Sequence, residues 1–586
     1  MAAQAQGVPT GPTPPIVACL RCREQKLKCG RELPSCERCR KQDAACTYPP
    51  PPDRKRIAAE KNNRAKASQL NSAKHNHERD SSSTDTSAAK KRRLSHDTTG
   101  PFSCLAEPEA ADLPSTEIGL LLQEVYFKRI YHAHLMFHKT VGFQVYMLNK
   151  MPDYLQRAKF AHAALFLQEI DPQYQRYVQA YPMQTLYERS WSWAHAASVQ
   201  VLSHVDEPSV LKIQTLQVLQ QFYWARGEIV RAKVHGTLAY RLSQLLGYDK
   251  LYENEDPTLM NPSLKFDREI RRRSFWASFA SMCLHSEEVP RIHESAAGLP
   301  LPAKFGPGGS IQGVELIHGQ KMTREWKLHE YSTRDGTETS SLMAELMKLL
   351  GIWARTRALV LEIRDRPNSH GVEELQSIEE SLDEVEPSMR FPVGHIFAKA
   401  RSYDESPEFL ICVCSVYYLA RIIVESSKYQ MMSNPASRTL ERTSGIEISP
   451  EARIIEESLK FTGLLRQLLD NGQDITRLWH VTGYAAFIVA RVMLFCHANH
   501  QSDGLVLSPL QAFDLDSEGV KTCQTVLEVL GIYWKPLKSL HPKLANLNAT
   551  IEVARSMSAD SFAMLTLPWD YINFLSDGEP ISDAGN

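Results

Sequence analysis

The sequence predicts a small N-terminal metal-cluster domain, a disordered basic linker and a large all-α domain. Three observations lead to this fold class. Six cysteines with the spacing of metal ligands lie within residues 19–46, residues 47–112 are polar and rich in proline and basic side chains, and apolar residues with helical spacing recur from residue 113 onward. Residues 1–18, which precede the cysteines, are expected to be disordered.

Two copies of one cysteine pattern make up the N-terminal domain. In each copy a Cys-x2-Cys pair is followed by a third cysteine after six intervening residues, and the complete set is Cys19, Cys22, Cys29, Cys36, Cys39 and Cys46. Such spacing suits thiolates that surround a tetrahedral zinc ion. Two zinc ions need eight ligands, and because only six thiolates are available, two sulfurs must bridge both metals. The pattern therefore predicts a binuclear cluster with two Zn2+ ions as cofactor.

A disulfide framework is the structural alternative for six cysteines. It requires an oxidising compartment, and the first 18 residues lack the basic and apolar stretches of an export signal. The reduced interior of the cell would keep the thiols available for metal. The other six cysteines have no ligand spacing and are expected to be core thiols: Cys104, Cys283, Cys412, Cys414, Cys496 and Cys523.

The segment ACLRCREQKLKCGRELPSCERCRKQDAACTYP resembles the fungal zinc binuclear cluster family of transcription factors. The resemblance implies a Zn2Cys6 domain in which Cys19 and Cys36 are the bridging ligands. One zinc would be held by Cys19, Cys22, Cys29 and Cys36, and the other by Cys36, Cys39, Cys46 and Cys19. The resemblance also implies a nuclear protein that binds double-stranded DNA at promoter sites with CGG triplets.

The predicted DNA contacts begin with basic side chains in the first half of the cluster domain. Arg23, Lys26 and Lys28 follow the second cysteine along a short helix, whereas the second half has Asp43 and two alanines in this region. The family resemblance places this helix in the major groove of DNA. Lys26 and Lys28 would then reach base edges, where lysine matches the acceptors of guanine, and Arg23 would make backbone or structural contacts.

The charge of the chain is divided between its two ends. Residues 1–100 contain 20 Lys and Arg against 10 Asp and Glu, and the remainder contains 47 against 58. A basic head on an acidic body is the pattern expected of a DNA-binding module joined to a domain that does not bind DNA.

Four prolines after the cluster predict a stiff spacer, after which Arg54, Lys55 and Arg56 can follow the phosphate backbone.

The linker offers almost no apolar surface to bury, so residues 47–112 are predicted to be largely disordered. It contains a basic run that suits nuclear import, although such a run can also serve only as a solubilising face: Lys90, Lys91, Arg92 and Arg93. Ile57 and Leu70 are the only large aliphatic residues in the segment 54–78. Since two residues cannot form a coiled-coil seam, the protein would bind as a monomer or pair through its body.

The body reads as all-helical from residue 113. Residues 113–305 resemble the fungal-specific transcription factor domain through LPSTEIGLLLQEVYFKRIYHAHLMFHK, TLQVLQQFYWARGEIVRAKVHGTLAYRLSQLLGYDKL and EIRRRSFWASFASMCLHS. In these segments Leu122, Tyr126 and Ile130 predict a core stripe, and Gly247 a helix end. Residues 306–340 are predicted to be a loop region, and residues 341–560 a helical continuation of the same regulatory domain.

No constellation of catalytic residues emerges from the body, so an enzyme is the disfavoured class. The run of glycines near residue 306 follows no apolar strand, and no G-x-S-x-G or H-E-x-x-H motif occurs. The residues Arg271, Arg272 and Arg273 point in different directions on a helix and are interpreted as a solvated, partly ion-paired face. Arg421 and Arg491 interrupt the long apolar runs, which predicts that no segment spans a membrane.

The last segment, 561–586, mixes aromatic with acidic side chains. Such a segment suits the groove of a coactivator or of another part of the transcription machinery, and the alternative is a C-terminal helix that docks on the body.

The sequence therefore predicts a zinc-dependent, sequence-specific regulator of RNA polymerase II genes, an activator of a metabolic or secondary-metabolite gene cluster. The alternative is a helical protein that senses a small-molecule effector or recruits a corepressor, with DNA contact that depends on a partner.

Overall fold

The computed structural model describes two separate compact units, which divide between residues 102 and 103. The described residues are 18–25, 28–32, 34–42, 44–47, 112–167, 183–250, 262–286, 299–302, 341–365, 370–392, 394–403, 405–433, 450–503, 518–557 and 571–577. The described residues of the N-terminal unit lie within 18–47, and those of the body begin at residue 112. The predicted linker therefore lies almost entirely outside the described residues, as do residues 303–340.

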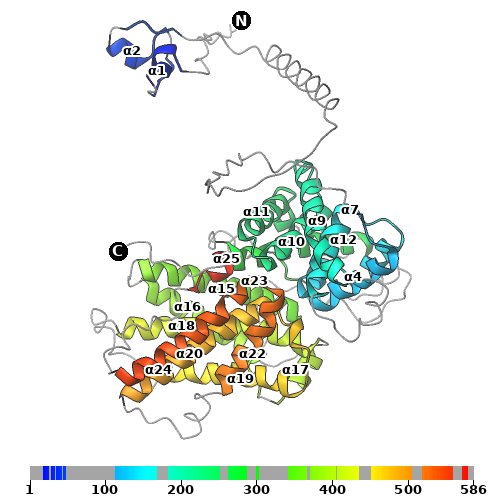
Figure 1. Ribbon diagram of the computed structural model, residues 1–586, viewed down its shortest axis with the longest axis vertical. Helices are drawn as coiled ribbons and strands as arrows, with labels where there is room; N and C mark the ends of the chain where they lie inside the picture. Colours follow the sequence, from blue (N-terminus) through cyan, green and yellow to red (C-terminus); the bar gives the residue numbers. More distant parts are fainter. Residues whose placement is uncertain are drawn as a thin grey trace, which may run out of the picture. The chain divides into compact units, whose positions relative to one another are not determined.

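The N-terminal unit contains two five-residue helices, α1 (Leu20–Glu24) and α2 (Glu37–Lys41), drawn in blue in Figure 1. Its described residues have no large apolar core, because Leu20, the one large aliphatic side chain among them, is 43 % exposed. The buried side chains of the unit are cysteines. So small a segment cannot bury enough apolar surface to fold without a further source of stability.

The body is built of helices, and its described residues include no strand. Its first half contains α4 (Thr116–Arg129), α5 (Tyr131–Met136), α6 (Lys139–Met147), α7 (Asp153–Ala164), α9 (Met183–Leu202), α10 (Val210–Ala225), α11 (Ile229–Leu245) and α12 (Pro262–His285). Its second half contains α15 (Leu342–Asp365), α16 (His370–Met389), α17 (Ile396–Ser402), α18 (Pro407–Ser433), α19 (Pro450–Asp470), α20 (His480–Asp503), α22 (Glu518–Tyr533), α23 (Lys535–Lys538) and α24 (Leu540–Met557). Short helices η2 (Leu165–Leu167), η4 (Tyr248–Lys250), η6 (Ile475–Arg477) and α25 (Phe574–Asp577) complete the body.

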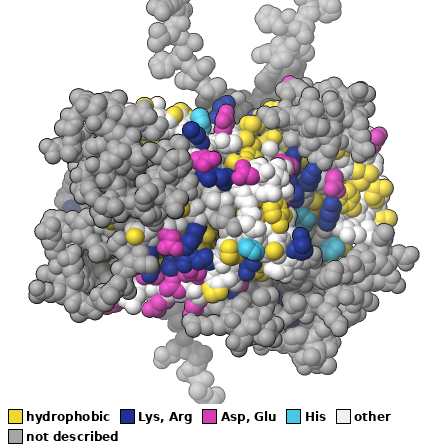
Figure 2. All heavy atoms as spheres, turned by 90° about the horizontal axis from the view of Figure 1, so that it is seen from below, with side chains coloured by type: hydrophobic (Ala, Val, Ile, Leu, Met, Phe, Trp, Pro, Cys, Tyr) yellow, Lys and Arg dark blue, Asp and Glu magenta, His cyan; other side chains and the backbone are white. Residues whose placement is uncertain are grey.

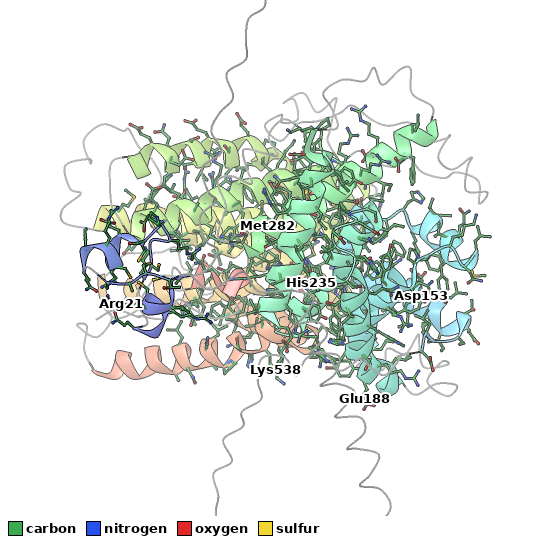
Figure 3. The ribbon with its side chains drawn as sticks, turned by 90° about the horizontal axis from the view of Figure 1, so that it is seen from above. Arg21, Asp153, Glu188, His235, Met282 and Lys538 are labelled. Atoms are coloured by element: carbon green, nitrogen blue, oxygen red, sulfur yellow. The ribbon has the colours of Figure 1, made fainter. Side chains whose placement is uncertain are left out.

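Helices that follow each other in sequence form antiparallel neighbours in the body. The pairs α10 with α11, α7 with α9, α18 with α19 and α20 with α22 pack closely, and α12 packs on α15 to join the two halves (Figure 1). Figure 3 labels His235 and Met282, which lie on the neighbouring helices α11 and α12. This all-helical architecture confirms the predicted fold class.

Local sequence signals account for several helix boundaries. The predicted core stripe Leu122, Tyr126 and Ile130 is buried. The chain reverses between α10 and α11 at Gly227 with φ of 78°, and α11 is followed by Gly247 with φ of 69°, a backbone region where glycine avoids the strain of a side chain. The apolar faces that these helices bury form one continuous core, in which Trp193, Trp224, Trp276 and Trp353 are fully buried.

Candidate metal centre and nucleic-acid interface

The two halves of the N-terminal unit repeat the same local geometry. Cys19 is the N-cap residue of α1 with φ −61° and ψ 153°, and Cys36 is the N-cap residue of α2 with φ −65° and ψ 147°. Because the second cysteine of each Cys-x2-Cys pair lies in the first helical turn, both sulfurs of a pair reach the same centre. The repeated spacing in the sequence is therefore a repeated structure.

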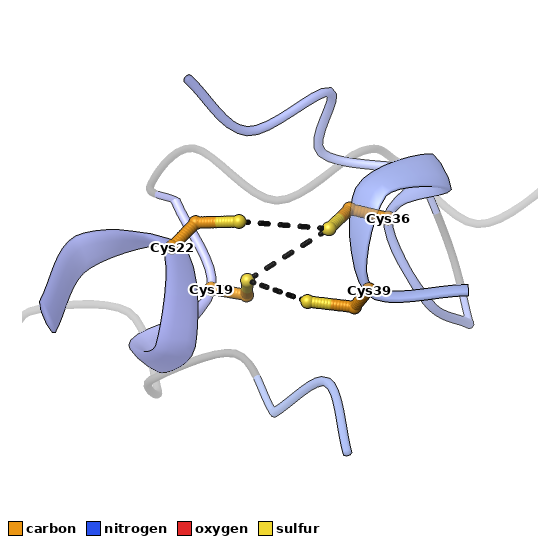
Figure 4. Close-up of side chains that lie close together, drawn as sticks. All are labelled: Cys19, Cys22, Cys36 and Cys39. Atoms are coloured by element: carbon orange, nitrogen blue, oxygen red, sulfur yellow. Dashed lines mark hydrogen bonds between the residues drawn. The ribbon is translucent and has the colours of Figure 1, made fainter. Parts of the chain in front are cut away.

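The sulfur atoms lie at the distances expected around zinc. The four Sγ atoms of Cys19, Cys22, Cys36 and Cys39 lie within 4.8 Å of one another. Figure 4 shows three of the contacts: 3.9 Å from Cys19 to Cys36, 3.8 Å from Cys19 to Cys39 and 3.9 Å from Cys22 to Cys36. A tetrahedron with zinc–sulfur bonds of ~2.3 Å has edges of about 3.8 Å. A disulfide would need a sulfur–sulfur distance of about 2.05 Å, and all the described cysteines are free thiols, so the disulfide alternative is wrong for them.

The third cysteine of each half lies at the edge of the same cluster. Cys29 and Cys46 are half-buried and pack against the four buried cysteines, so that the structure brings all six predicted ligands together. The amide N–H of Cys36 donates a hydrogen bond to Sγ of Cys46 at 3.3 Å. Hydrogen bonds donated by backbone amides stabilise thiolates, the form of cysteine that binds zinc.

The pKa values of the cysteines divide into two groups. The amide of Cys39 lowers the pKa of Cys36, and backbone amides, acting against burial, also bring the pKa values of Cys29 and Cys46 below the usual value. Burial raises the pKa of Cys22 and raises that of Cys39 to about 12. A dication beside these sulfurs would stabilise their thiolate forms and so lower the pKa values of the buried thiols.

The predicted DNA contacts are only partly described by the structure. Arg23 on α1 and Lys28 just after it are exposed. Lys26 lies outside the described residues, as do Arg54, Lys55 and Arg56 and the import segment Lys90, Lys91, Arg92 and Arg93.

The second helix of the N-terminal unit also carries exposed basic side chains. Arg38, Arg40 and Lys41 on α2 are exposed, and Lys41 pairs with Glu37 at 2.8 Å. Arg21 of α1 and Arg38 of α2 occupy equivalent positions, and the prediction that the first helix is the one that enters the DNA groove stays a prediction.

The arginine run on α12 is not a solvated face, contrary to the interpretation of the sequence. Arg272 and Arg273 are buried and both pair with the buried carboxylate of Glu269, at 2.5 and 2.6 Å. Arg271 alone fits the prediction, since it is exposed and pairs with Asp267 at 2.5 Å.

Figure 2 shows one face of the molecule, on which the basic and acidic side chains of described residues lie near one another.

The described part of the acidic and aromatic tail is docked on the body. Ile572, Phe574 and Leu575 are fully buried. The carbonyl oxygen of Leu575 accepts hydrogen bonds from Trp224 Nε1 at 3.0 Å and from His285 Nδ1 at 2.6 Å, and the carbonyl of Tyr571 accepts one from the hydroxyl of Tyr484 at 2.8 Å. Residues 571–575 therefore join α10 and α12 of the first half to α20 of the second, as the docked-helix alternative predicts.

The sequence argument against a membrane span was too strong. Pro407–Tyr429 in α18 is long and apolar enough to cross a membrane, with a mean hydropathy of 1.7, even though it contains Arg421. Every residue of its most apolar window is buried inside the body, as in the core helix of a water-soluble fold. The guanidinium of Arg421 contacts the carboxylate of Asp383.

Comparison with known proteins agrees with the geometry of the cysteines. Residues 17–55 match the family model of the fungal Zn(2)-Cys(6) binuclear cluster domain, whose cofactor is two zinc ions. The resemblance of residues 113–305 to the fungal-specific transcription factor domain stays a prediction, because the matched model covers only the N-terminal unit.

Three curated proteins are similar over longer stretches. An uncharacterised transcriptional regulatory protein of Schizosaccharomyces pombe is 24% identical over 268 residues, which cover 44% of this chain and 26% of the relative. The Zn(2)-C6 fungal-type transcription factors FTF1c and FTF1a of Fusarium oxysporum f. sp. lycopersici are 26% and 28% identical over 404 and 344 residues. These alignments cover 58% and 49% of this chain and 42% and 31% of the relatives. The chain thus matches less than half the length of each of these relatives.

Proposed function

We propose that this protein is a zinc-dependent, sequence-specific DNA-binding regulator of transcription by RNA polymerase II that acts in the nucleus. The observation that carries the proposal is the convergence of six cysteines in a domain that matches the Zn(2)-Cys(6) model. The names of the similar proteins support regulation of transcription rather than enzymatic catalysis. The acidic excess of the body supports a division in which the N-terminal unit alone contacts DNA.

Within the cluster, we assign one zinc to Cys19, Cys22, Cys29 and Cys36 and the other to Cys36, Cys39, Cys46 and Cys19. The contacts from Cys19 to both Cys36 and Cys39, and from Cys36 to Cys22, support this assignment, because each bridging sulfur must touch ligands of both metals. The ions hold the two halves together and so present α1 and α2 as one rigid surface.

For DNA recognition, Lys26 and Lys28 read guanines of a CGG triplet in the major groove, and Arg23 contacts the backbone. Arg54, Lys55 and Arg56 add phosphate contacts beyond the cluster, and Lys90, Lys91, Arg92 and Arg93 direct nuclear import. The exposed Arg38, Arg40 and Lys41 supply further phosphate contacts from α2, since they lie on the surface of the same small unit.

A role as activator of a metabolic gene cluster, through coactivators, is the finer form of the proposal. The docked tail argues that residues 571–575 do not supply the activating surface. The second candidate, a body that senses a small effector or recruits a corepressor while a partner contacts DNA, is favoured by a cavity between the two halves of the body.

The test is selection of DNA sites from a random library by the full-length protein. We expect enrichment of CGG triplets that disappears when zinc is chelated. Lys26→Ala should cost about 1–3 kcal/mol and relax the preference at one base, whereas the control Lys41→Ala should weaken all sequences alike. Equal enrichment of all triplets, or selection that survives removal of zinc, would contradict the proposal.

A further inference from the structure

A cavity of about 340 Å³ lies where the two halves of the body meet. Its walls come from α4, α5 and α12 of the first half and from the beginnings of α15 and α18, together with η6, of the second. This volume is at the lower end of the range of small-molecule sites in proteins. A molecule bound there would contact both halves at once.

Positive charge dominates the wall of the cavity. Lys128, Lys139, Arg273 and Arg477 line it, and among the described lining residues Glu405 is the single carboxylate. Glu124, Glu269 and Glu408 pair with Lys139, Arg273 and Arg477 from outside the lining, at 3.0, 2.6 and 3.0 Å. The lining itself therefore offers mainly cationic N–H donors, which favour an anionic ligand over a cationic one.

The two arginines are held in place from behind. Nε of Arg273 donates to the buried carboxylate of Glu269 at 2.6 Å, and a terminal nitrogen of Arg477 donates to that of Glu408 at 3.0 Å. Neither carboxylate lines the cavity. Oriented guanidinium groups lose little freedom when they bind a carboxylate, so they bind it more strongly than flexible surface cations do.

Two long helices begin at the cavity and add to the positive potential. Ser341 and Ser406, which both line it, precede the first turns of α15 and α18. Their hydroxyl oxygens accept hydrogen bonds from the amides of Ala344 at 3.1 Å and Phe409 at 3.2 Å. The N-terminus of a helix carries partial positive charge, which stabilises a nearby anion.

Aromatic rings form the rest of the wall. Tyr131 and Phe409 stack with ring centroids 4.8 Å apart, and Phe127 and Phe137 lie beside them in the lining. Phe127 and Phe137 also contact the fully buried Lys159, whose Nζ lies 4.8 and 4.9 Å from their ring centroids. Such a wall accepts the apolar part of a ligand while the cations hold its charged end.

We infer that this cavity binds a small organic acid: a carboxylate joined to an aromatic or branched apolar group. The guanidinium groups of Arg273 and Arg477 bind the carboxylate, and the apolar group packs on Tyr131 and Phe409. Because the ligand joins both halves of the body, it stabilises their contact. This inference rests on the second candidate function, a body that senses a small effector, and does not depend on DNA binding.

The test is calorimetric titration of the full-length protein with phenylacetate and with its uncharged analogue phenylacetamide, followed by benzoate, 4-phenylbutyrate, isovalerate and inorganic phosphate. We expect at least one organic acid to bind about tenfold or more tightly than the matching amide, since the amide lacks the charge-assisted bonds. Phosphate, which has no apolar part, should bind more weakly than that acid.

Four substitutions in the lining and one control test whether the acid binds in this cavity. Arg477→Gln should weaken binding of the acid about tenfold, and Arg477→Lys, which keeps the charge beside Glu408, should weaken it less. Met343→Trp should block the cavity without removing a charge, and the matched control Lys521→Gln on the exposed face of α22 should change nothing. If Arg477→Gln does not fold, Met343→Trp and Lys139→Gln decide the result.

The inference is wrong if none of the acids binds at millimolar concentration, or if amide and acid bind equally. It is also wrong if folded Met343→Trp protein binds the acid as tightly as the native protein. Failure of DNA selection would leave these titrations unchanged, so the two proposals fail separately.

Discussion

The N-terminal unit and the body hold themselves together by different means. In the N-terminal unit the buried side chains are sulfurs at ligand distances, whereas the body buries four tryptophans completely within a continuous apolar core. Cysteine has a different role in each region. The cysteines of the N-terminal unit are the predicted zinc ligands, whereas the body contains buried core thiols: Cys283, Cys412, Cys414 and Cys523. The difference teaches that the surroundings of a cysteine, rather than its burial, decide whether it binds metal.

The largest expected effect separates the two kinds of cysteine. Cys36→Ala removes a bridging sulfur, so we expect loss of both zinc ions and of DNA binding, with no change in the melting of the body. Cys523→Ala should keep two zinc ions and destabilise only the body. Zinc content and the thermal melt of each variant are the measurements, and zinc retained by Cys36→Ala would contradict the assignment.

Acid should weaken the body through four buried histidines. Burial lowers the pKa of His132 to about 4, lowers those of His162 and His285 to about 3, and lowers that of His480 well below its usual value. The unfolded chain binds these protons below pH about 6.5 and the folded body does not, so stability falls with decreasing pH. Each histidine contributes about 1.4 kcal/mol per pH unit. Glu425 and Glu457, whose pKa values burial raises, offset part of this loss.

Tryptophan fluorescence measures this effect in the body alone, because all nine tryptophans lie between residues 191 and 569. The free energy of unfolding of the body, measured with urea, should decline steeply from pH 7 to pH 5. The variant His480→Phe should reduce the pH dependence of the free energy of unfolding by the contribution of one proton. Neither ring nitrogen of His480 has a hydrogen-bond partner among the described residues, so the substitution removes no hydrogen bond to them. An unchanged slope in this variant would show that His480 is protonated in the folded body.

The docked tail should be a structural part of the body. Phe574 is fully buried and stacks on Tyr484 with ring centroids 5.7 Å apart, so Phe574→Ala should destabilise the body by about 3–5 kcal/mol. The control Leu245→Ala, at a side chain that is 75 % exposed, should change stability little. The structural role would be contradicted if Phe574→Ala melts at the native temperature and if residues 555–586, fused to an unrelated DNA-binding domain, activate a reporter gene. The tail would then be the segment that contacts a coactivator.

One substitution is predicted to make the body more stable. Lys159 is fully buried, its Nζ has no hydrogen-bond partner among the described residues, and burial lowers its pKa to about 7. Since the unfolded chain binds this proton up to pH about 10.5, stability rises with pH between 7 and 10.5. Lys159→Met should remove that rise and stabilise the body by on the order of 3 kcal/mol at neutral pH. Equal stability of variant and native protein at pH 7.5 would contradict the assigned burial.

The sequence was informative where the signal is local. The cysteine spacing predicted one cluster, the stripe of Leu122, Tyr126 and Ile130 predicted a buried helix face, and Gly247 predicted a helix end. Each of these signals lies within a few turns of chain, where side-chain spacing and backbone preference act directly.

The features that the sequence did not predict depend on contacts between distant segments. From three consecutive arginines on α12, sequence spacing alone does not reveal that Arg272 and Arg273 pair with Glu269 inside the body. In the same way, the composition of the tail does not show that Trp224 and His285 hold the carbonyl of Leu575. Burial of a charge or of a terminal segment is decided by tertiary packing, which residue spacing alone does not reveal.

The central claim is that metal maintains the N-terminal unit and apolar packing maintains the body. The most direct measurement is a chelator titration of the full-length protein in which DNA binding is followed by anisotropy and the body by its tryptophan melt. We expect removal of two zinc ions per chain to abolish DNA binding while the melting temperature of the body stays constant. DNA binding that persists without zinc, or a body that unfolds as the zinc is removed, would contradict the claim.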